Sequence, residues 1–208
     1  MYIRNLRKPS ANKNVFKFAS SKSTDAIMCE STIEFDACFH HEYNESVQYF
    51  ESQPQGFHYY FKGKKLPYTP DTKIVHDSGA IVLHEYKPYS QTSEPIFREK
   101  FEAKKEAAKQ LGMLLILVTD KQIRVEPLLN NLKILHRHSG VYGISEVQTW
   151  LLETIPKNSE VSLKDISDKH GFKLADARSM ICSLIGKGLI KANLTSDDLS
   201  AEFNVRCA

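Results

Sequence analysis

The sequence predicts an α/β protein in which a mixed sheet with flanking helices comes first and a smaller, mostly helical domain follows. Between residues 47 and 82, runs of aromatic and β-branched residues alternate with turn residues, which indicates strands. A charged helical segment, Pro95–Gln110, then leads into the continuous apolar run Met113–Val118. A strand, a crossover helix and a buried strand form a βαβ-type unit, and this unit predicts the sheet.

Three parts are expected along the 208 residues: a basic flexible arm over 1–28, the sheet domain over 29–127 and the helical domain over 128–208. No apolar run approaches the length of a membrane span, and no apolar segment follows the N-terminal cations as it would in a secretory signal. The four cysteines form no CxxC pair, which argues against a structural zinc and suits a reducing cytosol. We therefore expect a cytoplasmic protein.

The arm concentrates positive charge, although the net charge of the chain is only +3. From Met1 to Lys22 there are six Lys or Arg residues and no acid. One interpretation is a solvated tail, and the other is an arm that contacts nucleic-acid phosphates. The cations that we expect to contact phosphates are Arg4, Arg7, Lys8, Lys13 and Lys17.

A helix is predicted over Glu30–Tyr43. Ser31 is its expected N-cap, and Glu34 stands at the position from which a carboxylate reaches back in a capping box. Ile33 and Phe39 fall on one apolar face together with Cys38.

Strands and turns follow this helix in alternation, and Gly112 is expected to end the later charged helix. Met113–Val118 has the composition of a strand that is buried on both faces. The other expected strands are Phe57–Phe61, Tyr68–Val75 and Ala80–Tyr86, with turns at Gly63–Lys64 and His76–Gly79.

The second domain combines helices with a Gly-marked hairpin. The expected helices are 144–155, one that opens at 162–166, and 173–185, and the expected hairpin pairs 189–194 with 201–206. This order is typical of a winged helix. Its presumed recognition helix around 176–183 carries one cation, Arg178, whereas a helix that reads a groove normally carries more polar and basic side chains. We therefore favour protein docking over sequence-specific DNA reading for this domain, and list Arg178 as a candidate DNA contact.

Three charged residues interrupt the expected strands: Asp71, Glu85 and Lys87. Folding alone gives no reason for them, because an unpaired buried charge is expensive. Side chains alternate along a strand, so Glu85 and Lys87 point one way and Tyr86 points to the opposite face. The turn at His76–Gly79 is expected to bring Asp71 beside Glu85.

Two neighbouring carboxylates repel each other unless a cation lies between them. Mg²⁺ prefers oxygen ligands and keeps some of its waters, and we expect Mn²⁺ to substitute for it. The expected metal ligands are Asp71, Glu85 and the backbone carbonyl of Tyr86. Glu34 completes the carboxylate set, and whether it holds a second metal stays open. Lys87 orients or deprotonates the attacking water, or neutralises charge on the scissile phosphate.

This arrangement is the PD-(D/E)xK pattern of metal-dependent nucleases, and it predicts an enzyme that hydrolyses phosphodiester bonds in DNA. Two lysines of the charged helix, Lys104 and Lys105, are expected to follow a DNA backbone. His40, His41 and Glu42 are not expected to bind a metal, because adjacent helical residues face different ways; we expect a partly exposed helix face there.

Several short runs, taken in order, resemble the TnsA family, the endonuclease subunit of the heteromeric cut-and-paste transposases of Tn-seven-like elements. The resemblance covers about residues 28–195. The runs that carry it are Ser31-Thr32-Ile33-Glu34-Phe35, Gln53-Pro54, Thr69-Pro70-Asp71, Glu85-Tyr86-Lys87-Pro88 and Thr119-Asp120-Lys121-Gln122-Ile123.

The resemblance implies a restriction-endonuclease-like catalytic domain followed by a winged helix, in a bacterial protein. It implies that Glu34, Asp71 and Lys87 match the family's catalytic acid, acid and lysine. Glu85 stands where the best-known member has Gln, which moves this chain toward the ordinary PD-ExK pattern.

The resemblance also implies partners and a reaction. The subunit would cleave the 5′ strands at the ends of a transposon in double-stranded DNA. A DDE integrase subunit would cut and join the 3′ ends, and an AAA+ ATPase regulator would link both to target selection. Two alternatives stay open: a stand-alone restriction or repair nuclease with a fused winged helix, and a non-catalytic DNA-binding scaffold.

Overall fold

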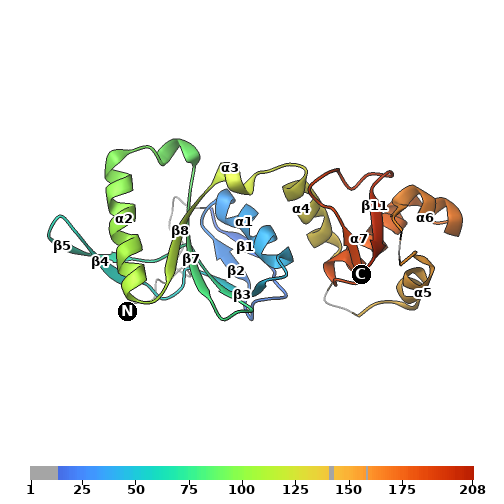
Figure 1. Cartoon of the computed structure of the whole chain (residues 1–208), viewed down its shortest axis with the longest axis horizontal. Helices are drawn as coiled ribbons and strands as arrows, with labels where there is room; N and C mark the ends of the chain where they lie inside the picture. The colour runs from blue at the N-terminus through green and yellow to red at the C-terminus, as the bar shows by residue number, and fades with distance from the viewer. Residues whose placement is uncertain (1–13, 141–142, 158) are drawn as a thin grey trace. The chain divides into compact units, whose positions relative to one another are not determined.

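The computed structural model describes residues 14–140, 143–157 and 159–208 (Figure 1). They divide into two compact units, Met1–Arg124 and Val125–Ala208, so the second unit begins three residues before the position expected from the sequence. Within the described residues, no helix is long and apolar enough to cross a membrane. The cations Arg4, Arg7, Lys8 and Lys13 lie outside the described residues.

The first described segment of unit 1 is a hairpin of β1 (Phe16–Phe18) and β2 (Ile27–Cys29), which pair antiparallel. Phe18 is buried, and its ring meets the ring of Phe39 edge-on, with centroids 5.0 Å apart. The expectation of a flexible arm as far as residue 28 is therefore wrong for residues 14–28. Alternating apolar side chains give this segment a core to pack against.

Helix α1 (Thr32–Tyr43) begins two residues after the predicted start, ends where predicted, and has Ser31 as its N-cap as expected. The backbone N–H of Glu34 donates to the Ser31 hydroxyl at 3.2 Å, which satisfies one of the free donors at the start of the helix. Ile33, Cys38 and Phe39 are buried, as the predicted apolar face requires.

The central sheet contains β3 (Val47–Ser52), β6 (Thr72–His76), β7 (Ile81–Lys87) and β8 (Leu114–Thr119), in the order β3-β6-β7-β8. The pairs β3–β6 and β6–β7 are antiparallel, and β7–β8 is parallel. The 3-10 turn η1 (Tyr89–Gln91) and helix α2 (Pro95–Gln110) connect β7 to β8, which confirms the βαβ unit and the bounds predicted for the helix. Gly112 has a φ of +75°, the left-handed conformation that ends a helix.

A separate hairpin is formed by β4 (Phe57–Phe61) and β5 (Lys64–Tyr68). The single strand expected over Tyr68–Val75 is wrong, since β5 ends at Tyr68 and β6 begins at Thr72. Pro70 lies in the link and has no N–H to donate to a ladder. The chain therefore leaves the β4–β5 hairpin at Tyr68 and enters the central sheet at Thr72. Asp71 is the last residue of the link between them.

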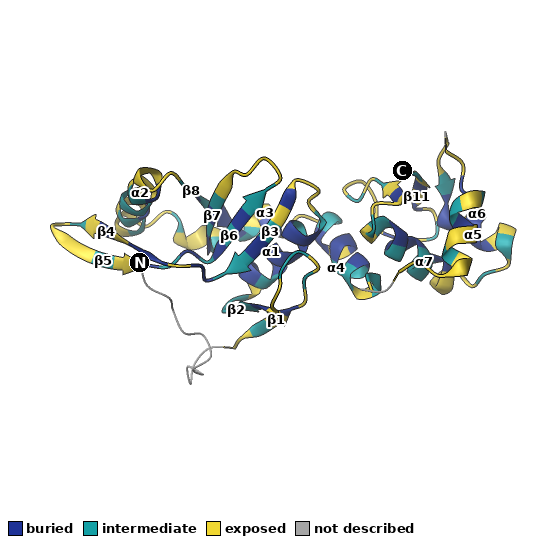
Figure 2. Ribbon diagram, turned by 90° about the horizontal axis from the view of Figure 1, so that it is seen from below, coloured by how far each residue is buried: buried dark blue, intermediate teal, exposed yellow. Residues whose placement is uncertain are grey.

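Each face of the central sheet has its own core, and Figure 2 colours the buried segments of its strands dark blue. Leu83 and Leu115 pack with Phe101 of α2 on one face, together with the inner side of the β4–β5 hairpin. Tyr86 and Val118 pack on the other face against α1 and the short helix α3 (Asp120–Ile123). Strand β8 is thus covered on both faces as predicted, except at its start, where Leu114 is 52% exposed.

Unit 2 is a helical domain with a small sheet. Its strands lie in the order β10-β11-β9, with both pairs antiparallel. Leu135, Leu151, Leu163 and Ile181 are among the fully buried side chains of its core. Its elements are α4 (Leu128–His138), α5 (Glu146–Thr154), β9 (Val161–Ser162), α6 (Leu163–His170), α7 (Leu174–Gly186), β10 (Ile190–Ala192) and β11 (Asn204–Cys207).

Candidate active site

Asp71 lies immediately before β6, beside Glu85 on the neighbouring strand β7. Thr72 pairs with His84 in the antiparallel ladder, so Asp71 and Glu85 occupy the next opposed positions. The backbone N–H of Asp71 donates to the carbonyl of His84 at 3.0 Å, and the N–H of Tyr86 donates to Asp71 Oδ2 at 2.8 Å. These two hydrogen bonds fix the carboxylate at the start of β6.

Glu34 reaches this neighbourhood from the first turn of α1 and is only 8% exposed. Its Oε1 accepts from the Ser31 hydroxyl at 2.8 Å, and its Oε2 accepts from the backbone N–H of Glu30 at 2.9 Å. Burial raises the pKa of Glu34, while these hydrogen bonds and the charge of Lys87 act in the opposite direction. Lys87 is therefore close enough for its charge to act on the helical carboxylate.

Glu85 is paired with a lysine of α2. Lys104 Nζ lies 2.9 Å from Oε1 and 2.8 Å from Oε2, and the carboxylate is 5% exposed. The same ammonium lies 4.1 Å from the centre of the Tyr68 ring. Lys104, which we expected on a DNA backbone, therefore occupies a largely enclosed place on Glu85. Lys105 does lie on the surface, where it pairs with Glu102 at 3.6 Å.

The pKa of Asp71 is raised to about 7. Burial is the largest cause, and the charges of Glu34 and Glu85 add to it, while the Tyr86 N–H and Lys87 act in the opposite direction. Near neutral pH this carboxyl is therefore poised between its two protonation states. A cation placed among the three carboxylates would favour the ionised form.

Within the described residues, no three side chains of His, Cys, Asp or Glu converge in an arrangement that could hold a metal ion. The Glu34 carboxylate accepts a hydrogen bond from Ser31, and the Glu85 carboxylate accepts one from Lys104. The chemistry of the donor set nevertheless fits a hard divalent cation, because it offers carboxylate oxygens whose mutual repulsion a cation would relieve. Binding would require Glu34 and Glu85 to exchange these partners for the metal.

A polar network supports Tyr86 on the other face of β7, and the sequence did not reveal it. The Tyr86 hydroxyl lies 2.7 Å from His41 Nε2 and 3.2 Å from His84 Nδ1. Burial lowers the pKa of both imidazoles, that of His84 to about 4. The expected partly exposed helix face is wrong for His41, and also for Glu42, which accepts hydrogen bonds from the hydroxyls of Ser20 and Ser21. The helical period was the signal that could have placed His41. His41 follows Glu34 by seven residues, so both side chains lie on the same side of α1.

Of the other expected DNA contacts, the described residues include Lys17 and Arg178. Lys17 is exposed on β1. Arg178 belongs to unit 2, where it is half-buried on α7 and where its Nε has no hydrogen-bond partner.

Residues 44–120 match the family model described as TnsA-like endonuclease N terminal. This segment is similar to the N-terminal part of TnsA-like endonucleases. The match runs from just before β3 to the first residue of α3, so it contains Asp71, Glu85 and Lys87, and Glu34 precedes it. No match was found among the curated proteins.

The TnsA-like segment supplies the sheet that gathers the charged residues. Its mixed sheet with flanking helices is compatible with a TnsA-like nuclease fold, and the family indicates a DNA nuclease of a Tn-seven-like transposase. DNA is therefore the substrate class that the family implies.

Proposed function

We propose that this chain is the Mg²⁺-dependent endonuclease subunit of a cut-and-paste transposase and that it cleaves the 5′ strands at transposon ends. One observation carries the proposal. The TnsA-like segment places Asp71 and Glu85 on opposed strand positions, with Lys87 close enough to act on Asp71. A half-buried Asp71 whose pKa is raised by the neighbouring charges of Glu34 and Glu85 is costly for folding alone, and a bound cation would relieve that cost.

The residues that would hold Mg²⁺ are Asp71, Glu85, Glu34 and the backbone carbonyl of Tyr86. When bound, Mg²⁺ polarises a phosphodiester oxygen and lowers the pKa of a coordinated water, and Mn²⁺ is expected to serve as well. Asp71 is already oriented by the Tyr86 N–H, and the network behind Tyr86 keeps that N–H in place. Whether one or two ions bind depends on Glu34.

Lys87 is the proposed water-orienting or phosphate-neutralising residue. Its charge acts on both Asp71 and Glu34, so it lies within reach of whatever sits between them. Lys104 has a different role, because its ammonium group pairs with Glu85. Its release from Glu85 would accompany assembly of the metal site.

A winged helix is the proposed identity of unit 2. The order α5-β9-α6-α7-β10-β11, with a three-stranded antiparallel sheet, is the arrangement that this proposal requires. Docking to a protein is favoured over reading DNA, because Arg178 is half-buried while Trp150 of α5 is 45% exposed. The proposed partners are a DDE integrase that processes the 3′ ends and an AAA+ ATPase regulator.

The test is cleavage of donor DNA that carries both transposon ends, in Mg²⁺ and in EDTA, with and without the cognate integrase. The proposal predicts 5′-strand cuts that need the integrase and Mg²⁺, and that disappear with Asp71→Ala and with Lys87→Ala. Cuts made without the integrase would instead establish a stand-alone nuclease. Undiminished cutting by the Asp71→Ala variant would rule out the assigned chemistry.

A further inference from the structure

The hairpin β4–β5 carries a cluster of positive charge that is separate from the proposed catalytic residues. From Phe57 to Tyr68 the chain has three lysines and no acid. Lys62, Lys64 and Lys65 are all exposed at or beside the turn of the hairpin.

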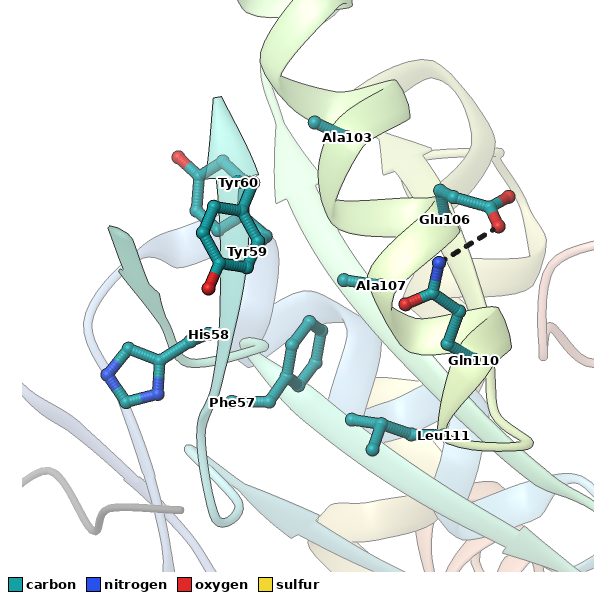
Figure 3. Close-up of a pocket in the computed structure, with 9 residues that line it drawn as sticks. All are labelled: Phe57, His58, Tyr59, Tyr60, Ala103, Glu106, Ala107, Gln110 and Leu111. Atoms are coloured by element: carbon teal, nitrogen blue, oxygen red, sulfur yellow. Dashed lines mark hydrogen bonds between the residues drawn. The ribbon is translucent and has the colours of Figure 1, made fainter. Parts of the chain in front are cut away.

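The inner face of this hairpin is fixed to the body of unit 1. Phe57, Tyr59 and Tyr68 are buried in the same cluster as Phe101 of α2 and Leu115 of β8. Figure 3 shows Phe57 extending toward α2 and His58 pointing away from that helix. Residues of β4 and α2 line a pocket of about 400 Å³. Packing of its inner face therefore holds the hairpin in place, and the outward side chains project from an ordered backbone.

The outer face of the hairpin presents polar and basic groups. Tyr60 is 69% exposed and pairs across the ladder with Lys65, while His58 and Pro67 occupy the next outward pair. A phenol and an ammonium side by side offer two hydrogen-bond donors to an anionic oxygen. A protein partner would be expected to meet a face poorer in lysine than this one.

The positive charge of the hairpin turn continues onto α2 at Lys100, and the next lysine toward the active site, Lys104, is paired with Glu85. Lys62 and Lys100 place their ammonium groups 5.2 and 5.7 Å from the centre of the Phe61 ring. One turn further along α2, Lys104 lies on the Tyr68 ring and contacts Glu85. Glu99 offsets part of this charge through an exposed pair with Lys62 at 3.4 Å.

We propose that the β4–β5 hairpin is a DNA-binding arm that lies along the sugar–phosphate backbone of the duplex next to the scissile phosphate. This inference rests on the proposed nuclease function. Each strand has five residues, which at about 3.3 Å per residue spans roughly 17 Å, the axial length of about five base pairs. Because β5 ends three residues before Asp71, the arm and the catalytic carboxylates are joined by one short link.

The proposed partner is a polyanion, and the lysines of the hairpin would contact its phosphates without recognising the base sequence. Lysines that neutralise phosphates release counterions, so each lost contact lowers the salt dependence of binding by roughly 0.9 in a plot of log K against log salt. The variant Lys62→Gln, Lys64→Gln, Lys65→Gln removes three exposed cations and leaves the buried inner face intact. A matched control is Lys157→Gln, Lys164→Gln, Lys169→Gln, which removes three exposed lysines from unit 2.

The experiment measures binding of a labelled duplex to the full chain in EDTA at several salt concentrations, and cleavage by the assembled system in Mg²⁺. The hairpin variant should bind at least about tenfold more weakly at low salt, with a slope lower by roughly 2 to 3, while the control keeps the wild-type slope. Its melting temperature should match that of the wild type, which separates lost contacts from unfolding.

Two outcomes would overturn the inference while the wild type still cleaves: an unchanged slope in the hairpin variant, or an equal loss in both variants. A defect seen only when the integrase is present would also overturn it, because the arm would then dock a protein. If the wild type binds DNA through the hairpin but does not cleave in the assembled system, the proposed function fails and the DNA-binding arm stands.

Discussion

The ammonium group of Lys104 contacts both carboxylate oxygens of Glu85, at 2.9 and 2.8 Å, in a site where both side chains are largely enclosed. The lysine comes from the crossover helix α2 and the carboxylate from β7, so the pair ties the helix to the strand that carries the proposed metal ligands. In the proposed metal site, Mg²⁺ would have to balance the charge that Lys104 balances in this structure. If Mg²⁺ binds there, the two cations compete for one carboxylate.

Replacement of Lys104 by Met is expected to destabilise the protein in EDTA and to make Mg²⁺ a stronger stabiliser than it is for the wild type. Removal of one partner from a buried ion pair typically costs about 3 to 5 kcal/mol, because the other charge is left uncompensated. Mg²⁺ would restore that compensation in the variant without having to displace the lysine. Thermal unfolding in EDTA and in Mg²⁺ measures both effects.

The control for this experiment is Lys105→Met, one residue along the same helix, where the lysine is exposed and paired with Glu102. It should change the melting temperature little in either condition, since exposed pairs contribute about 1 kcal/mol or less. An equal Mg²⁺ response in the Lys104 variant and the wild type would contradict competition for Glu85.

The ionisation of Asp71 should make the metal-free protein less stable as the pH rises. Its pKa is raised to about 7 in the folded state, so between the ordinary carboxyl pKa and 7 the folded chain holds a proton that the unfolded chain has lost. Stability therefore falls across that range and levels off above it. Asp71→Asn removes this dependence and should be the more stable protein at pH 8 in EDTA, although it cannot support cleavage.

Urea unfolding at pH 5 and pH 8 checks this expectation, with the Asp71→Asn protein as its own reference. The wild type should lose stability relative to the variant between the two values, and saturating Mg²⁺ should abolish the difference by favouring the carboxylate. A wild type that gains on the variant toward pH 8 in EDTA would mean that the pKa of Asp71 is not raised.

Replacement of Lys87 by Gln should separate metal binding from catalysis. We expect cleavage by the assembled system to fall by roughly 10²- to 10³-fold, the loss typical when one preorganised charge is removed from a transition state. Stabilisation by Mg²⁺ should persist, because the carboxylates remain. Loss of Lys87 should also raise the pKa of Asp71 further, since its charge now acts to lower that pKa.

The measurement pairs single-turnover cleavage with the pH dependence of stability for the Lys87→Gln protein, and Lys73→Gln on β6 serves as the control. Lys73 forms a partly exposed pair with Glu51 at 3.1 Å, so its loss should leave both readouts unchanged. Wild-type cleavage by the Lys87 variant would exclude the role assigned to this lysine.

The local features of the sequence predicted most of unit 1 because they act over short distances. Ser31 followed by Glu34 predicted the start of α1, and Pro95 and Gly112 bracketed α2. The strand Lys64–Tyr68 escaped prediction because Pro67 weakens its strand pattern and Pro70 lies in the link to β6, so the two strands looked like one.

The sequence predicted those residues of the candidate site that are unusual in a strand and whose pairing depends on a single turn. Asp71, Glu85 and Lys87 stood out because strand positions rarely carry charge, and a single turn determines that Asp71 opposes Glu85. The pairing of Lys104 with Glu85 spans 19 residues and depends on how α2 packs on the sheet. Nothing local distinguishes Lys104 from the other lysines of the same helix.

The hydroxyl of Tyr86 is expected to hold the active-site strand in place, and Tyr86→Phe tests this with the loss of one oxygen. The hydroxyl lies between His41 and His84 on the face of β7 away from Glu85, so its removal leaves buried ring nitrogens without their partner. Such a loss typically costs about 1 to 3 kcal/mol. Because the Tyr86 N–H orients Asp71, cleavage by the assembled system should fall as well, whereas the affinity for duplex DNA in EDTA should stay unchanged. Tyr89→Phe is the control, since Tyr89 is exposed. A Tyr86→Phe protein with wild-type stability and full cleavage would show that the network does not support the site.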